Sequence, residues 1–206
     1  MSAVERGRFI VLEGSDGCGK STQAARLVRA LGARGHDVQA TFEPGATELG
    51  RSLRSVLLGG ELAPTARAEA LLMAADRAQH VDTVIRPALD AGTWVVSDRF
   101  VGSSLAYQGR ARGLGVDAVA AVNAFATTGL EPDLVVLLAA PAAVLAARRQ
   151  GPADRIEGEG EGFLAAVVDA YDRLAATLGW VVVDATPGPD DVERAVWAAV
   201  EQAVAP

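Results

Sequence analysis

The sequence predicts an α/β fold in which a five-stranded parallel sheet carries helices on both faces. Two observations support this prediction. Five short apolar runs alternate along the chain with longer stretches of helical period. The apolar runs are nearly continuous in Val, Ile and Leu, which is typical of strands buried on both faces of a parallel sheet. The length of 206 residues fits one domain covering residues 1–206.

The elements follow in order from these patterns. The first strand is a short apolar run that ends at a glycine, and the expected strands are 9–13, 38–42, 94–98, 133–138 and 180–184. The expected helices are 19–34, 49–58, 65–91, 116–129, 142–150, 163–178 and 190–204. The long helix should bend near Pro87 and stop at Gly92.

Composition excludes several classes of function. The chain has 26 acidic and 19 basic residues and a net charge of −7, which argues against a protein that coats nucleic acid. Its one cysteine, Cys18, forms no internal disulfide, and the N-terminus lacks the apolar segment of a secretory signal. The longest uncharged run, 134–147, contains Pro141 and is shorter than the roughly 18 apolar residues of a membrane span. We expect a cytoplasmic protein without membrane contact.

The strongest motif follows the first strand. Residues 14–21, Gly-Ser-Asp-Gly-Cys-Gly-Lys-Ser, match the phosphate-binding loop (P-loop) G-x-x-x-x-G-K-[ST] between a strand and a helix. Backbone amides of such a loop wrap a phosphate, and the helix N-terminus adds partial positive charge. The residues expected to bind ATP are Gly14, Ser15, Asp16, Gly17, Cys18, Gly19, Lys20, Ser21 and Thr22. The fold class is therefore a three-layer P-loop NTPase sandwich.

Further residues narrow the class of P-loop protein. Lys20 should reach the donor phosphates, and the Ser21 hydroxyl and the Asp98 carboxylate should serve Mg²⁺. Arg99, beside Asp98, suits a phosphate contact, although a salt bridge at the strand end is the alternative. Arg54 and Arg77, on the helices between the second and third strands, fit an anionic acceptor, although either arginine taken alone is more often a solvated surface charge.

At this point the chain resembles the bacterial thymidylate kinases. The most specific piece is the Ser-Ser-Leu-Ala-Tyr-Gln-Gly run at 103–109, which other P-loop kinases lack. The motifs that appear in the family's order are the P-loop with Asp16, Glu43-Pro44-Gly45, residues 74–77 (Ala-Ala-Asp-Arg), 97–100 (Ser-Asp-Arg-Phe), 103–109 and 154–157 (Asp-Arg-Ile-Glu). The resemblance extends from about residue 8 to the last helix.

The resemblance implies the roles of individual residues. Asp16 would lie near the 3′-hydroxyl of the acceptor and the transferring phosphate, and Arg99 and Arg54 would hold the acceptor phosphate. Arg77 would bind the thymine edge, and Glu43 is counted with the residues that bind substrate. Three further residues would surround the base and sugar, namely Ser104, Gln108 and Tyr107. Tyr107 would exclude a ribose 2′-hydroxyl, although Tyr107 in the core and Gln108 as a helix cap remain alternatives.

The resemblance also implies how catalytic charge is supplied. Some family members carry an arginine directly after the acidic P-loop residue, where this chain has Gly17; members with glycine there use arginines of a lid. The lid would be the segment of about 148–162, which supplies Arg149 and Arg155 as catalytic residues and also holds Arg148. This segment is short and acidic, with Glu157, Glu159 and Glu161 alternating with glycine.

Two departures from the family pattern concern the base. Phe42 stands where bacterial members usually have an arginine before Glu-Pro-Gly, and Met73 stands where they usually have a phenylalanine against thymine. We therefore expect Met73 to pack on the base and consider Phe42 as a replacement aromatic surface, with a core position for Phe42 as the alternative.

The activity expected on this basis is phosphoryl transfer from ATP to dTMP with Mg²⁺, giving dTDP and ADP, in a homodimer that uses the 65–91 helix as its surface. A kinase for another nucleoside monophosphate is one alternative. A P-loop nucleotide switch is the other, and the N-K-x-D element of guanine-specific switches is absent.

Overall fold

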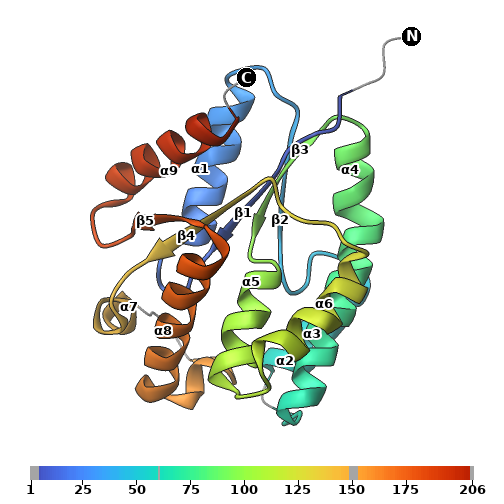
Figure 1. Ribbon diagram of the computed structural model, residues 1–206, viewed down its shortest axis with the longest axis vertical. Helices are drawn as coiled ribbons and strands as arrows, with labels where there is room; N and C mark the ends of the chain where they lie inside the picture. The colour runs from blue at the N-terminus through green and yellow to red at the C-terminus, as the bar shows by residue number, and fades with distance from the viewer. Residues whose placement is uncertain (1–4, 60, 149–152, 205–206) are drawn as a thin grey trace.

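The computed structural model describes residues 5–59, 61–148 and 153–204 (Figure 1). Its sheet has five strands, and every pairing between them is parallel. The strands are β1 Phe9–Glu13, β2 Val38–Phe42, β3 Trp94–Asp98, β4 Leu134–Ala139 and β5 Val181–Asp184. Their spatial order is β2-β3-β1-β4-β5, so the strand that precedes the P-loop lies at the centre. The predicted fold class is confirmed.

Helices cover both faces of this sheet, as the alternation of side chains along β1 requires. Ile10 and Leu12 point to the face covered by α1 and α9, and Phe9 and Val11 point to the opposite face. The helical elements are α1 Lys20–Gly32, α2 Glu48–Leu58, α3 Ala66–His80, η1 Val81–Ile85, α4 Arg86–Asp90, α5 Val101–Ser104, η2 Leu105–Ala111, α6 Val116–Thr127, α7 Ala142–Arg148, η3 Glu157–Glu159, α8 Glu161–Leu178 and α9 Pro189–Val204.

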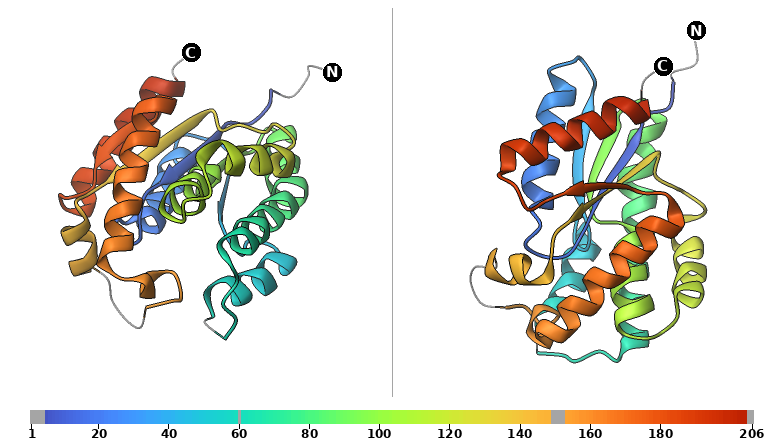
Figure 2. Two further views of the ribbon diagram at one scale, coloured as in Figure 1. Left: turned by 60° about the horizontal axis from the view of Figure 1, so that its bottom comes forward. Right: turned by 60° about the vertical axis from the view of Figure 1, so that its left-hand side comes forward.

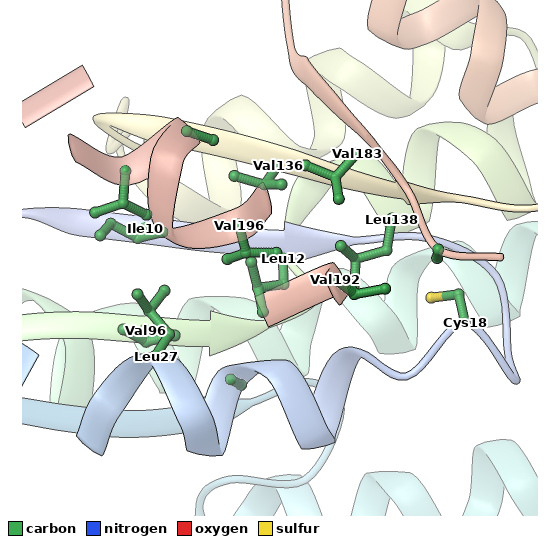
Figure 3. Packing of buried hydrophobic residues seen from close by; sticks show 14 of the residues in the cluster. Ile10, Leu12, Cys18, Leu27, Val96, Val136, Leu138, Val183, Val192 and Val196 are labelled. Carbon is green, nitrogen blue, oxygen red and sulfur yellow. The ribbon is translucent and has the colours of Figure 1, made fainter. Parts of the chain in front are cut away.

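The core on the α1/α9 face is a cluster of aliphatic side chains. Leu27 of α1 and Val192 and Val196 of α9 pack with Ile10 and Leu12 of β1 (Figure 3). Complete burial of one such side chain is worth about 1.5–3 kcal/mol, so this layer fixes the strand that leads into the P-loop. Among the described residues, no helix has the length and apolarity needed to cross a membrane.

Two stretches differ from the sequence prediction. The expected 65–91 helix is α3, the π-helical η1 and α4 in succession, so the irregularity precedes Pro87. Residues 101–111, for which no element was expected, are the short α5 followed by the π-helical η2. Gly102 and Gly109 lower the helix propensity there. Contacts with α8 and α6 stabilise the stretch instead, and Figure 2 shows it beside α8.

Candidate active site

The carboxyl ends of three neighbouring strands form the floor of the site. Leu12 of β1 and Phe42 of β2 are both in register with Asp98 at the end of β3. The backbone N–H of Glu43 donates to the Asp98 carbonyl at 3.0 Å. The P-loop, the Glu43 turn and the Asp98-Arg99 pair therefore meet at one edge, where open parallel sheets bind ligands.

The P-loop packs tightly against the sheet and α7. Gly14 has a φ of +143°, and a Cβ there would lie 2.7 Å from the Leu138 carbonyl oxygen. Gly17 has a φ of +86°, and a Cβ there would lie 2.9 Å from the Leu145 carbonyl oxygen. The Cys18 side chain is buried in the aliphatic cluster under the loop (Figure 3). Only glycine therefore fits at positions 14 and 17, and the Cys18 side chain contributes to packing under the loop.

The start of α1 is arranged to bind an anion. Gly19 precedes the helix in the left-handed conformation, and no side chain of the described residues caps that end. The backbone N–H groups of the first turn are therefore available to a phosphate. Lys20 is 6% exposed and donates from Nζ to the Ser15 carbonyl at 3.1 Å, so its ammonium group lies over the loop.

Ser21 and Asp98 form a pair that suits Mg²⁺. The Ser21 hydroxyl donates to Asp98 Oδ2 at 2.6 Å. The other oxygen of Asp98, Oδ1, is buried and has no hydrogen-bond partner among the described residues. A hydroxyl and a carboxylate with an unpaired oxygen match the few protein ligands that Mg²⁺ takes beside nucleotide phosphates. The residues present therefore fit the metal.

Arg99 is held over the P-loop by several acceptors. Its backbone has a φ of +75°, a conformation that costs a non-glycine residue free energy and that clusters at functional sites. The guanidinium donates to the Gly14 carbonyl, to the hydroxyls of Ser103 and Tyr171, and to Asp16. Burial favours protonated Asp16, but the charges of Arg99 and Lys20 outweigh it and hold the pKa of Asp16 well below its usual value. The Asp16 carboxylate is therefore ionised.

Glu13, directly before the P-loop, braces the chain that follows Arg99. Its carboxylate accepts from the backbone N–H of Phe100 and Ser103 and from the hydroxyls of Ser103 and Tyr171. Burial raises the pKa of Glu13, and these donors and Arg99 oppose that rise. Sequence analysis did not single out Glu13 or Tyr171, because their partners are distant in the chain.

Arg77 is the centre of a buried polar network. Its side chain is 2% exposed, and it pairs with Glu43 at 2.8 Å. The guanidinium also donates to the Ser104 hydroxyl at 2.9 Å and to Asn123. His80 contacts the second oxygen of Glu43 at 2.9 Å. Arg77 is therefore fixed in one orientation, and the reading of Arg77 as a surface charge is wrong.

One cavity brings together almost all of the predicted substrate residues. It is lined by Asp16, Glu43, Arg54, Met73, Arg77, Arg99, Ser104, Tyr107 and Gln108. Phe42 is 46% exposed, so it is not a core residue, and it is not among the described residues that line the cavity. Its contact with the base stays a prediction. The lining that the prediction missed includes Asp76, Asp154 and Ile156.

A second cavity, of about 370 Å³, adjoins the other side of the P-loop. It is lined by Gly17, Gly19, Thr22, Arg148 and the 185–189 loop before α9. Arg148 donates to the Ala185 and Thr186 carbonyls at 2.6 and 2.8 Å, so α7 is fastened to this loop. Nothing in the loop sequence had marked it as part of the site.

The predicted lid arginines are placed differently from one another. Arg149 lies outside the described residues. Arg155 donates from Nε to the Leu57 carbonyl at 2.7 Å and from Nη2 to Glu69. Its side chain thus contacts α2 and α3, and a catalytic role for Arg155 stays a prediction.

A P-loop beside a cavity with arginines and hydrogen-bonding groups defines a phosphotransferase of the P-loop class. The family model described as thymidylate kinase matches residues 12–196. The chain is 53% identical over 187 residues to the thymidylate kinase of Synechococcus sp. strain CC9902, covering 87% of this chain and 90% of that protein. It is 48% identical over 204 residues to that of Synechococcus sp. strain WH7803, covering 95% and 96%. The chain belongs to the thymidylate kinase family.

Proposed function

We propose that the protein transfers the γ-phosphoryl group of ATP to dTMP and releases dTDP and ADP. The observation that supports this most directly is the cavity beside the P-loop, which joins Arg77, Arg99, Tyr107 and Gln108. The attacking group is a phosphate oxygen that is already ionised. Catalysis therefore needs alignment and charge neutralisation more than proton transfer.

The P-loop side supplies the charge. Lys20 and the N–H groups at the start of α1 stabilise negative charge on the transferring phosphoryl group. Ser21 and Asp98 would hold Mg²⁺, which would supply positive charge to neutralise the donor phosphates. The cavity lined by Arg148 and the 185–189 loop adjoins the same loop and would take the donor base.

The acceptor side supplies orientation. Arg99 and Arg54 line the cavity and present cations to the phosphate of dTMP. Arg77 donates to the Ser104 hydroxyl at 2.9 Å and both side chains line the cavity, where we assign them to the thymine edge. Tyr107 would exclude a ribose 2′-hydroxyl, and two observations support this role: it lines the cavity, and its hydroxyl donates to Asp16 at 3.1 Å.

The remaining properties follow the family. The protein acts as one domain with a lid of about 148–162, in the cytoplasm and without nucleic acid or membrane partners. It forms a homodimer through the 65–91 stretch, and the neighbouring α6 extends this surface. Leu71 of α3 is 58% exposed and Phe125 of α6 is 88% exposed, and both are large apolar side chains suited to an interface.

ADP release with and without dTMP tests this function. A dTMP kinase releases ADP at a rate that depends on dTMP and forms dTDP in equal amount. A rate of ADP release that does not depend on dTMP would favour the nucleotide switch. Dependence on a different monophosphate would favour the other kinase.

A further inference from the structure

Glu69 of α3 is a buried carboxylate beside the acceptor cavity. Its side chain is 1% exposed. Oε1 accepts from Gln108 Nε2 at 2.9 Å and from Arg112 Nε at 3.2 Å. Oε2 accepts from Arg112 Nη2 at 3.2 Å and from Arg155. One carboxylate therefore joins an amide from η2 to two guanidinium groups.

The charges of this cluster balance. Arg112 also donates to Glu159 at 2.6 Å, so two arginines face two glutamates. Burial alone would raise the pKa of Glu69, but hydrogen bonds from Gln108, Arg155 and Arg112 outweigh it and lower the pKa. Buried ion clusters of this kind add little net stability, because desolvation offsets their attraction. The cluster is therefore better explained by the side chains that it holds in place than by a gain in stability.

Through Arg155, Glu69 holds one wall of the acceptor cavity in position. Arg155 is fastened at three points: its side chain donates to Glu69 and the Leu57 carbonyl, and its backbone N–H donates to the Leu58 carbonyl at 3.3 Å. Its chain neighbours Asp154 and Ile156 both line the acceptor cavity. Displacement of Arg155 would therefore move these two side chains.

Glu69 also fixes the orientation of the Gln108 side-chain amide. A carboxylate can only accept hydrogen bonds, so Gln108 must turn its amide nitrogen toward Glu69. Gln108 is 2% exposed and lines the cavity. Its carbonyl oxygen is consequently directed away from Glu69, and its amide cannot rotate without breaking that bond.

We propose that Glu69 is a positioning residue of the acceptor site, which fixes Gln108 directly and the Asp154 and Ile156 wall through Arg155. The proposal rests on the proposed function, because it assigns these groups to the binding of dTMP. It also gives Arg155 a task other than charge neutralisation during transfer. The two tasks predict opposite kinetics.

The test is steady-state kinetics of Arg155→Gln, Glu69→Gln and the double variant. A positioning role predicts that Arg155→Gln raises the KM for dTMP by about tenfold or more, while kcat stays within about threefold and the KM for ATP is unchanged. Because Arg155 and Glu69 share one contact, the two changes should not be additive, and the loss in the double variant should be smaller than the product of the two single losses. Arg155→Lys should recover part of the loss.

The matched control is Arg173→Gln, which removes an exposed arginine–aspartate pair of α8 and should change none of these constants. A fall in kcat at constant KM would overturn the proposal and make Arg155 catalytic. Equal effects on both substrates, or none, would also overturn it. If Glu69→Gln fails to fold, Arg155→Gln decides alone, since its side chain is partly exposed. If the wild-type protein does not phosphorylate dTMP, the proposed function is contradicted. The role of Glu69 would then be tested by measuring kcat and KM of the same variants with the nucleoside monophosphate that the wild type does phosphorylate.

Discussion

Replacement of Arg77 by Gln should lower both the stability of the fold and the binding of the acceptor. The change leaves the Glu43 carboxylate, 4% exposed, without its arginine. Removing one partner of a buried pair costs about 3–5 kcal/mol. For a chain of this size each kcal/mol lowers Tm by about 2–4 °C, so the expected loss is roughly 6–20 °C. The KM for dTMP should rise by more than about tenfold.

The partner change Glu43→Gln separates the two effects. In the double variant the uncompensated charge is gone, and Gln can still accept from His80, so Tm should recover by at least about half. The KM for dTMP should not recover, because the cation beside the base is still missing. Thermal unfolding followed by circular dichroism, with the exposed Arg194→Gln as control, measures the first effect. The reasoning is refuted if the single variant unfolds like the control, or if the double variant is less stable than the single.

Three further predictions concern the phosphate side and the sugar. Lys20→Ala should abolish phosphoryl transfer while dTMP still binds in a calorimetric titration; turnover within about tenfold of the parent would contradict the P-loop assignment. Tyr107→Phe should keep most discrimination against ribonucleotides and Tyr107→Ala should lose it, as kcat/KM for dTMP and its ribonucleotide would show. The lowered pKa of Asp16 means that its ion pair stabilises the fold above the ordinary value of 3.8 and loses this effect as pH falls further. The difference in unfolding free energy between wild type and Asp16→Asn should therefore shrink from about pH 5 to pH 3 in urea titrations, and a constant difference would exclude the linkage.

Local signals in the sequence predicted the parts of the site that depend on neighbouring residues. The P-loop needs its glycines and Lys20 within one turn between a strand and a helix, so the motif alone places them. The strand ends follow from the hydrophobic pattern, which puts Asp98 and Arg99 beside that loop. The acceptor-site residues taken from the family resemblance line one cavity with the exception of Phe42, whereas Arg148 and Arg155, taken from it as lid residues, are not among the described residues that line it.

The parts that sequence analysis missed depend on contacts between distant segments. Glu69 reads as an ordinary helical glutamate until Arg112 and Arg155 are brought to it by the fold. Asn123 is likewise recognisable only by its contact with Arg77. Phe42 shows a related limit, because the last residue of an edge strand can point to either side; here its side chain is exposed, and its contact with the base stays a prediction.

The central claim is that the cavity beside the P-loop selects dTMP as acceptor. The most direct measurement is kcat/KM with ATP for a panel of dTMP, dUMP, UMP, dCMP and dAMP. The structure predicts that dTMP is the best substrate and that dUMP, which lacks one methyl group, is about 10- to 200-fold poorer. It predicts that UMP and the two amino-substituted bases are poorer still. A panel in which any of these exceeds dTMP, or in which all react equally, would contradict the claim.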